Sequence, residues 1–310
     1  MPIAAYVAMG IFLKKIYTTN MKIVLQINGG IGKSIMATAV VAAIKNQHPD
    51  SRVIVITGYP EVFEGNRKVY KNLRHNELNY FYREHIQDQP DTLLFMQEPY
   101  LDTEFIHRRG HLIEVWCHMN GIEYSGELPE LFISHKEKTA YAGMFQSPKP
   151  ILLLQTNGGM PNQTDKYSWP RDLPFGVAQQ VVNAFAPTHN VVQMRRKDQP
   201  TLQNVYPAES GFRQLAVLIL MSDKRLFIDS FAQHAAAALG KPSVVCWIAN
   251  TPTQFGYAMH TNVLANEPTL EPELRLSILS KYNTNGPEAE FPYNNEDEIF
   301  DLAKILAALQ

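Results

Sequence analysis

The sequence predicts an α/β protein in two domains, each built around a parallel sheet. Residues 222–248 are typical of a buried strand, a polar turn, a short Ala-rich helix and a second buried strand. Residues 22–57 show the same order of strand, loop and helix, here with a glycine-rich loop. Strands that alternate with helices in this way form parallel sheets. The chain has 310 residues, 45% of them hydrophobic, which is enough to bury two medium-sized cores.

The predicted domain boundary lies at residues 147–150, Ser-Pro-Lys-Pro. Proline lacks a backbone N–H, so this run cannot continue a helix or a central strand. Residues 21–147 then form a first domain and residues 148–292 a second one. Residues 1–20 precede the first predicted strand and are interpreted as an N-terminal extension. Residues 293–310 carry an apolar stripe, which predicts a C-terminal helix that packs across both domains.

The turn at Asp229 and Ser230 is the strongest candidate for a ligand site. Both residues stand where a predicted strand ends and a helix begins, so the backbone N–H groups of that helix face the space above the sheet. His234 lies four residues after Ser230, on the same helix face. Ligands of open α/β sheets bind at the carboxyl ends of the strands, and a phosphate suits this turn best. The structural alternatives are a simple N-cap and a buried histidine.

The run that begins at Asp229 resembles the nucleotide-sugar signature of glycosyltransferase family nine, the ADP-heptose:lipopolysaccharide heptosyltransferases. That signature is Asp-(Ser/Thr)-Gly-x-x-His-(Ile/Leu)-Ala-x-Ala-Leu-Gly-x-Pro, and the chain matches it at Asp229, Ser230, His234 and the segment Ala-Leu-Gly-Lys-Pro. Phe231 stands where the family has glycine. The resemblance implies a glycosyltransferase B-type fold, in which two doubly wound, Rossmann-like parallel-sheet domains face each other across the active cleft. The second domain would bind the donor and the first would present the acceptor.

A glycine loop, Asn-Gly-Gly-Ile-Gly-Lys-Ser, occupies residues 28–34. Glycines let the backbone approach a ligand, and the helix that follows offers free N–H donors. The loop resembles the family's Gly-Gly-Ile-Gly-Asp and matches it at Gly29, Gly30 and Gly32, but Lys33 replaces the Asp. The resemblance implies that this Asp is the general base, a role that lysine fills only when its neutral form is strongly favoured. Either another carboxylate serves, or Lys33 binds a phosphate or an acidic acceptor, or the protein is not an active transferase.

The same loop also resembles the deviant phosphate loop of partitioning ATPases, Lys-Gly-Gly-x-Gly-Lys-(Ser/Thr). That pattern requires lysine where Asn28 stands, and the Walker A pattern requires glycine at Ile27. No acidic partner for magnesium is evident at the end of a downstream predicted strand. A phosphate-loop ATPase is therefore the third hypothesis.

Three further residues are donor-binding candidates through the resemblance. The family has a strand that ends in a small hydroxyl residue, followed by a loop with lysine shortly before Trp-Pro. Thr156 and Lys166 match these positions, ahead of Trp-Pro at residues 169–170, and would contact the donor phosphates. Thr251 matches a loop that lines the family's donor pocket. The basic run at residues 195–197 ends another predicted strand and could reach the same phosphates, with ordinary surface charge as the alternative.

The composition predicts neither a nucleic-acid partner nor a metal site. A formal net charge of −2 gives no electrostatic reason to expect nucleic-acid binding. Cys117 and Cys246 lie in apolar runs without the spacing of metal ligands, which fits a reducing cytoplasm. The resemblance implies that helix N-termini and basic side chains bind the phosphates, so no cofactor or metal is expected.

The leading hypothesis is an inverting transfer of a heptose or hexose from a nucleotide diphosphate sugar. The acceptor would be a hydroxyl of a cell-envelope glycan or glycolipid, as in lipopolysaccharide biosynthesis, and the protein would be cytoplasmic. Residues 11–17, which include Lys14 and Lys15, also predict a weak contact with the inner face of the membrane. The second hypothesis is a catalytically silent nucleotide-sugar-binding protein of the same fold.

Overall fold

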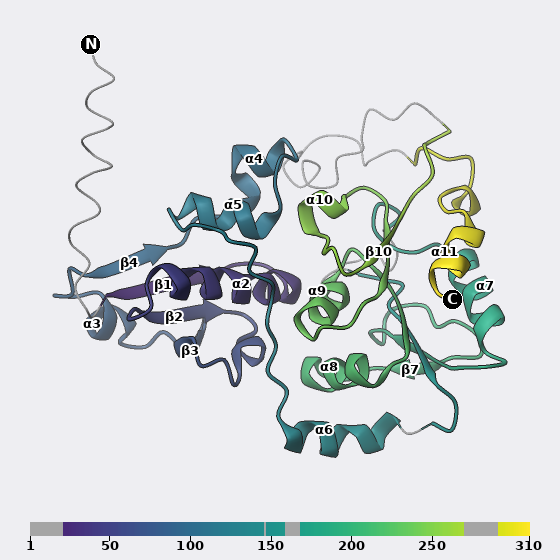
Figure 1. The fold of residues 1–310 in the computed structure, drawn as a ribbon, viewed down its shortest axis with the longest axis horizontal. Helices are drawn as coiled ribbons and strands as arrows, with labels where there is room; N and C mark the ends of the chain where they lie inside the picture. The colour runs from purple at the N-terminus through teal and green to yellow at the C-terminus, as the bar shows by residue number, and fades with distance from the viewer. Residues whose placement is uncertain (1–20, 146, 159–167, 270–290) are drawn as a thin grey trace, which may run out of the picture.

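The computed structural model describes residues 21–145, 147–158, 168–269 and 291–310. It contains one parallel sheet in each half of the chain, and the two halves lie side by side with helices between the sheets (Figure 1). All pairings among the described strands are parallel. The predicted α/β class, with two doubly wound parallel-sheet domains, is confirmed.

The first sheet has the strand order β3-β2-β1-β4. Strands β2 and β3 lie on one side of β1, and β4 lies on its other side, so the chain changes direction between β1 and β4. Such a switch point opens a crevice at the carboxyl ends of the two strands. The strands are β1 (Lys22–Ile27), β2 (Arg52–Thr57), β3 (Val69–Arg74) and β4 (Thr92–Phe95).

The second sheet has the order β10-β9-β8-β5-β6-β7. Its switch point lies between β5 and β8, because β6 and β7 extend the sheet on one side of β5 and the later strands extend it on the other. The strands are β5 (Ile151–Leu154), β6 (Asn190–Met194), β7 (Tyr206–Ala208), β8 (Lys224–Ile228), β9 (Val244–Trp247) and β10 (Thr261–Leu264).

Helix α2 (Ile31–Gln47) is buried on all sides. Its sequence is apolar around the whole circumference because it packs on the first sheet, on α5 (Leu112–Met119) and on α9 (Phe231–Ala238) of the second domain (Figure 1). The other helical segments of the first half are short: η2 (Pro60–Phe63), α3 (Phe81–His85), η3 (Pro99–Leu101) and α4 (Thr103–Ile106).

One apolar core crosses from the first domain into the second. It joins buried side chains of α2 and α5 to Ala232, Ala235 and Ala236 of α9 and to Trp247 of β9. The small alanines let the two helices approach closely. A second core fills the opposite face of the second sheet beneath α7 (Phe175–Phe185). The remaining helices of this half are α8 (Phe212–Met221) and α10 (Pro252–Phe255).

The segment just before the predicted boundary at residue 147 packs against the second domain. Helix α6 (His135–Ala142), placed in the first domain by the boundary at 147, packs against α8. Arg213 of α8 donates hydrogen bonds of 2.7 and 2.9 Å to the two carboxylate oxygens of Glu137 on α6. Segment η4 (Gly143–Phe145) follows directly.

The C-terminal helix α11 (Leu302–Ala308) packs on α7 and β10, both in the second domain. We expected it to lie across both domains. Its buried residues, Ile305 and the adjoining Leu309, belong to the second core, because the apolar surface that they meet lies beside α7. Segment η6 (Glu296–Glu298) precedes it. The predicted extension, residues 1–20, lies outside the described residues.

Candidate active site

The two switch points are neighbours. The loop after β1 continues into α2, and the loop after β8 continues into α9. These two helices meet at their N-terminal ends, where a Cβ atom added to Gly32 would lie only 3.1 Å from Cδ2 of His234. Gly32 thus permits the close approach of a neighbouring helix, where we had expected the approach of a ligand. Gly29 has φ +104°, a conformation that favours glycine, and Gly30 is the N-cap residue of α2.

The N-terminus of α9 offers its backbone to the crevice of the second sheet. Ser230 is the N-cap residue, but its side chain makes no capping hydrogen bond. Its Oγ instead accepts a 3.3 Å hydrogen bond from Nε2 of Gln155, at the end of β5. The predicted turn therefore joins both strands of the switch point. The first N–H groups of α9 and the positive end of its dipole favour an anion there.

Asp229 and His234 tie α9 to the loop that follows β9. Asp229 accepts a hydrogen bond from Nδ2 of Asn250. His234 is buried, and its Nδ1 lies 2.8 Å from the hydroxyl oxygen of Tyr257. Burial lowers the pKa of His234 well below its usual value, so the imidazole is neutral. His234 thus packs against α2 and binds Tyr257, and it contributes to the contact between the domains.

Thr156 follows β5 and is buried. Its hydroxyl donates to Oδ1 of Asn157 over 2.9 Å and accepts from Nε2 of Gln193 over 3.1 Å. Both bonds hold the loop after β5 in place. Thr156 therefore orients Asn157 in this structure, and its contact with a donor phosphate stays a prediction.

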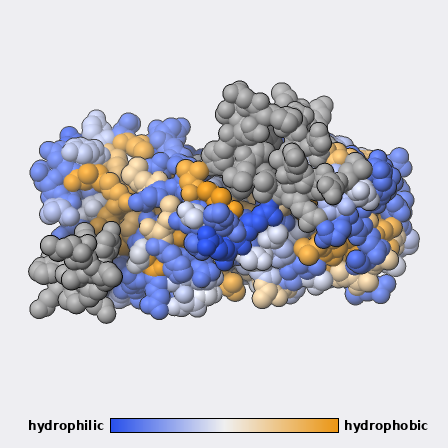
Figure 2. All heavy atoms as spheres, turned by 90° about the horizontal axis from the view of Figure 1, so that it is seen from above, coloured by the Kyte–Doolittle hydropathy of each residue, from blue (hydrophilic) through white to orange (hydrophobic). Residues whose placement is uncertain are grey.

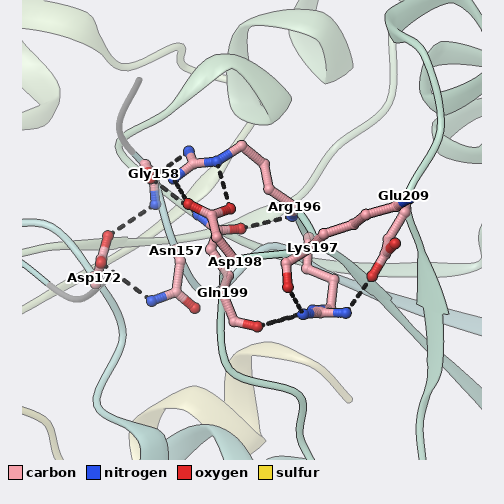
Figure 3. Close-up of polar contacts among 9 residues, drawn as sticks. Asn157, Gly158, Asp172, Arg196, Lys197, Asp198, Gln199 and Glu209 are labelled. Atoms are coloured by element: carbon pink, nitrogen blue, oxygen red, sulfur yellow. Dashed lines mark hydrogen bonds and ion pairs between the residues drawn. The ribbon is translucent and has the colours of Figure 1, made fainter. Parts of the chain in front are cut away.

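Asp172 organises the same loop and was not predicted. The buried carboxylate accepts hydrogen bonds from Nδ2 of Asn157 (3.1 Å) and from the backbone N–H of Gly158 (2.8 Å), both drawn in Figure 3. It also accepts one from the backbone N–H of Ser168 (2.9 Å). Burial raises the pKa of Asp172, and these bonds oppose that shift. A lone Asp after Trp-Pro-Arg carries no sequence pattern that could have revealed this role.

The basic residues after β6 bond to their own loop and to neighbouring loops. Arg195 pairs with Glu209, and Arg196 donates to Asp198 over 3.1 Å and to the carbonyl oxygen of Gly158 over 3.3 Å (Figure 3). Arg196 therefore joins the loops after β5 and β6. Both guanidinium groups already have protein partners where we had considered phosphate contacts.

Lys33 is buried and faces a carboxylate. Its Nζ pairs with Oε1 of Glu98, in the loop after β4, and lies 4.8 Å from the ring centroid of Tyr100 and 5.2 Å from that of Trp116. An ammonium group between two aromatic faces gains cation–π attraction. It has no lone pair with which to accept a proton, so the position of the family's base holds a cation here. Glu98 was not among the predicted residues.

This geometry also bears on the phosphate-loop hypothesis. In such a loop the lysine reaches the nucleotide phosphates and the helix N-terminus stays open to them. Here Lys33 turns to Glu98, and the first turn of α2 is packed against α9 at Gly32. Both observations oppose an ATP site at this loop.

Aromatic side chains seal the two domains together beside Lys33. The ring of Phe255 on α10 lies 5.4 Å from that of Phe105 and 6.2 Å from that of Tyr100, both from the first domain. The ring of Tyr257 lies 5.6 Å from that of His111. Burial lowers the pKa of His111 to about 4. These contacts bring the loop after β9 onto the first domain.

The structure gives less information on the two remaining predicted donor-binding residues, Thr251 and Lys166. Thr251 is the N-cap residue of α10 and makes no side-chain capping bond. Lys166 lies outside the described residues. Among the residues that the structure describes, no group of three or more His, Cys, Asp or Glu side chains could hold a metal ion. In the same part of the chain, no helix combines the length and apolarity needed to cross a membrane.

No protein-family model and no curated protein matches the sequence. Solved structures do match. A family 9 glycosyltransferase from Veillonella parvula aligns with 93% of this chain and 95% of its own, at 11% identity and a TM-score of 0.65. Escherichia coli ADP-heptose lipopolysaccharide heptosyltransferase II aligns with 93% of this chain and 98% of its own, at 13% identity and a TM-score of 0.61. The E. coli heptosyltransferase WaaC, solved with ADP, covers 79% of this chain and 94% of its own, at 8% identity and a TM-score of 0.52.

At these identities the likeness concerns the fold, and it spans both domains. The three structures are those of the family that the motifs at residues 29–32 and 229–242 resemble. The chain therefore has the two-domain glycosyltransferase B-type fold of glycosyltransferase family nine.

Proposed function

We propose that this protein transfers a heptose or hexose, with inversion, from a nucleotide diphosphate sugar to a hydroxyl group of a cell-envelope glycan or glycolipid. The observation that carries the proposal is the meeting of the two switch points at Gly32 and His234. It sets the N-terminus of α9, whose N–H groups and dipole favour an anion, beside the crevice of the first sheet. A structural neighbour, WaaC, was solved with ADP.

The diphosphate of the donor would lie at the N-terminus of α9. Ser230 and the N–H groups behind it would receive the charge that develops on the leaving group. Asp229, held by Asn250, and Thr251 would flank the donor, and Lys166 would supply a cation. His234 and Thr156 would act indirectly, because their side chains bond Tyr257 and Asn157. Because these groups would bind the diphosphate, the proposed reaction includes no metal ion and no cofactor.

The first domain offers an apolar rim for an acceptor. Met96 and Leu101, on either side of Glu98 in the chain, are 49% and 54% exposed. Figure 2 shows apolar surface among hydrophilic side chains over this domain. A glycolipid suits such a rim better than a purely polar glycan does. A cytoplasmic protein that touches the inner face of the membrane would meet such an acceptor there.

A thermal-shift panel of UDP, GDP, ADP, CMP and their sugars tests donor binding. A ligand present at 100 times its Kd stabilises the native state by about 2.7 kcal/mol, so the true donor should stand out. We expect one nucleotide diphosphate to stabilise the wild type and the control Asp50→Ala, altered at an exposed residue, and to lose its effect on Asp229→Ala. Stabilisation by none of the panel would contradict the proposal. A response to ATP with magnesium alone, dependent on Lys33, would indicate the ATPase.

The catalytically silent alternative keeps one specific observation in its favour. Lys33 occupies the position of the family's base and is paired with Glu98. A silent protein would bind a nucleotide sugar in the thermal-shift panel and release no nucleotide from it. Turnover of the bound donor decides between the two.

A further inference from the structure

We propose that Glu98 removes the proton from the acceptor hydroxyl and that Lys33 positions it. The inference rests on the proposed function, for which it names the base. Glu98 follows β4 at the switch point of the first sheet, where a ligand of this domain is expected. A carboxylate that is within reach of the acceptor hydroxyl can act as its general base.

The two oxygens of Glu98 have different surroundings. Oε1 accepts from Nζ of Lys33 and, over 3.3 Å, from the backbone N–H of Tyr100. Oε2 has no hydrogen-bond partner in the described part of the chain, and the side chain is 27% exposed. One oxygen is thus anchored, and the other is available to an acceptor hydroxyl.

Lys33 fixes the anchored oxygen. Its side chain is only 3% exposed, and the ammonium lies over the rings of Tyr100 and Trp116, on separate elements. Pro99, directly after Glu98, begins η3 and restricts the backbone at this point. The carboxylate is therefore held from both its side chain and its backbone, which is the preorganisation that a base requires.

The donor site lies across the domain contact from this pair. Gly32, the residue before Lys33, meets Phe231 and His234 in the first turn of α9. In the proposed step the hydroxyl proton passes to Oε2 of Glu98 while the hydroxyl oxygen bonds to the anomeric carbon. The bond from that carbon to the phosphate oxygen breaks, and its electron pair leaves with the nucleoside diphosphate at the N-terminus of α9.

Glu98→Gln tests the assignment because the amide keeps the side-chain volume and the oxygen that accepts from Tyr100. The donor is the nucleotide sugar that stabilises the wild type in the thermal-shift panel. Its Kd and the rate of nucleoside diphosphate release are measured from pH 4.5 to 9, with water and with a cell-envelope glycolipid extract as acceptor. Glu104→Gln, altered at an exposed carboxylate on α4, is the control. Lys33→Met/Glu98→Gln removes both charges and excludes a misfolded Glu98→Gln protein as the explanation.

We expect Glu98→Gln and the double variant to bind the donor as the wild type does. Both should release nucleotide at least about 100-fold more slowly than the wild type, the usual size of a general-base effect. Glu104→Gln should match the wild type. A Glu98→Gln rate above about one tenth of the wild-type rate, or a wild type that binds donor and never turns it over, would overturn the inference and leave donor binding intact. Absence of donor binding would overturn the proposed function itself.

Discussion

The two switch points of this molecule are built in different ways. In the second domain the polar residues that follow β5 and β8 bond one another, as Gln155 does to Ser230 and Thr156 does to Asn157. In the first domain the charge after β1, on Lys33, is matched by Glu98, which lies 65 positions further along the chain. A short motif thus describes the switch point of the second domain, whereas the Lys33–Glu98 pair of the first domain exists only once β1 and β4 lie side by side. The second switch point is thus built from residues of its own domain's strand ends, whereas the charges of the first come from two loops that are far apart in the chain.

Separating the charges of Lys33 and Glu98 should have the largest effect on stability. Glu98→Ala removes the carboxylate partner of a buried ammonium, and we expect a loss of about 3 kcal/mol in the free energy of unfolding. Lys33→Met/Glu98→Gln should recover most of that loss, because the buried charge is gone. Urea denaturation of the wild type, Lys33→Met, Glu98→Gln and the double variant measures the coupling of the pair, and Glu98→Ala is measured beside them. A coupling near zero would show that the pair does not organise the acceptor side.

The contact between the two switch points should be sensitive to one methyl group. Gly32→Ala places a Cβ 3.1 Å from Cδ2 of His234, and we expect a cost of about 2 kcal/mol from overpacking. Gly58→Ala is the matched control, since no atom lies within 4 Å of an added Cβ there. Thermal unfolding of the two variants checks the prediction. Equal melting temperatures would mean that α2 and α9 are free to separate.

The burial of His111 between the domains should make the free energy of unfolding depend on pH. Its pKa is about 4 in the fold against 6.5 in the unfolded chain, so the unfolded state binds the proton first as pH falls. The contribution of this group to stability is therefore fully present above pH 6.5, and about 3 kcal/mol of it is lost as the pH falls to 4. His111→Asn keeps an N-cap acceptor and cannot titrate, so its stability should fall less steeply in this range. Some slope remains because burial also lowers the pKa of His234 and His260.

His135→Asn, altered at an exposed histidine of α6, is the control for this titration. Its stability should follow the wild-type curve between pH 6.5 and 4. A His111→Asn curve parallel to that of the wild type would place the acid sensitivity elsewhere in the molecule.

The parts of the fold that the sequence revealed are those with strong local patterns. The apolar runs of β1 and β8, each followed by a helix, predicted both sheets and the ends of strands where the site lies. Helix α6 has no buried residue, so its pattern could not tell which domain it covers. The stripe of α11 predicted a buried face, but an amphipathic pattern does not name the surface that it meets.

The candidate site was predictable on one side only. Asp229, Ser230 and His234 stand in a recognisable order within one strand–turn–helix unit. Glu98 lies in a stretch with no periodic pattern, and its importance depends on a contact with Lys33 that only the folded chain creates. The packing of Phe255 on Tyr100 is equally invisible, because it joins two loops of different domains.

The helix shared by both domains limits how the molecule can move. Interfaces between domains are usually small and polar, and such domains hinge apart easily. Here α2 is enclosed by its own sheet, by α5 and by the alanines of α9, within one continuous apolar core. Opening a hinge would expose that core to water, so the two halves behave as one cooperative folding unit. A donor and an acceptor, under the proposed function, would then bind while the two domains stay together.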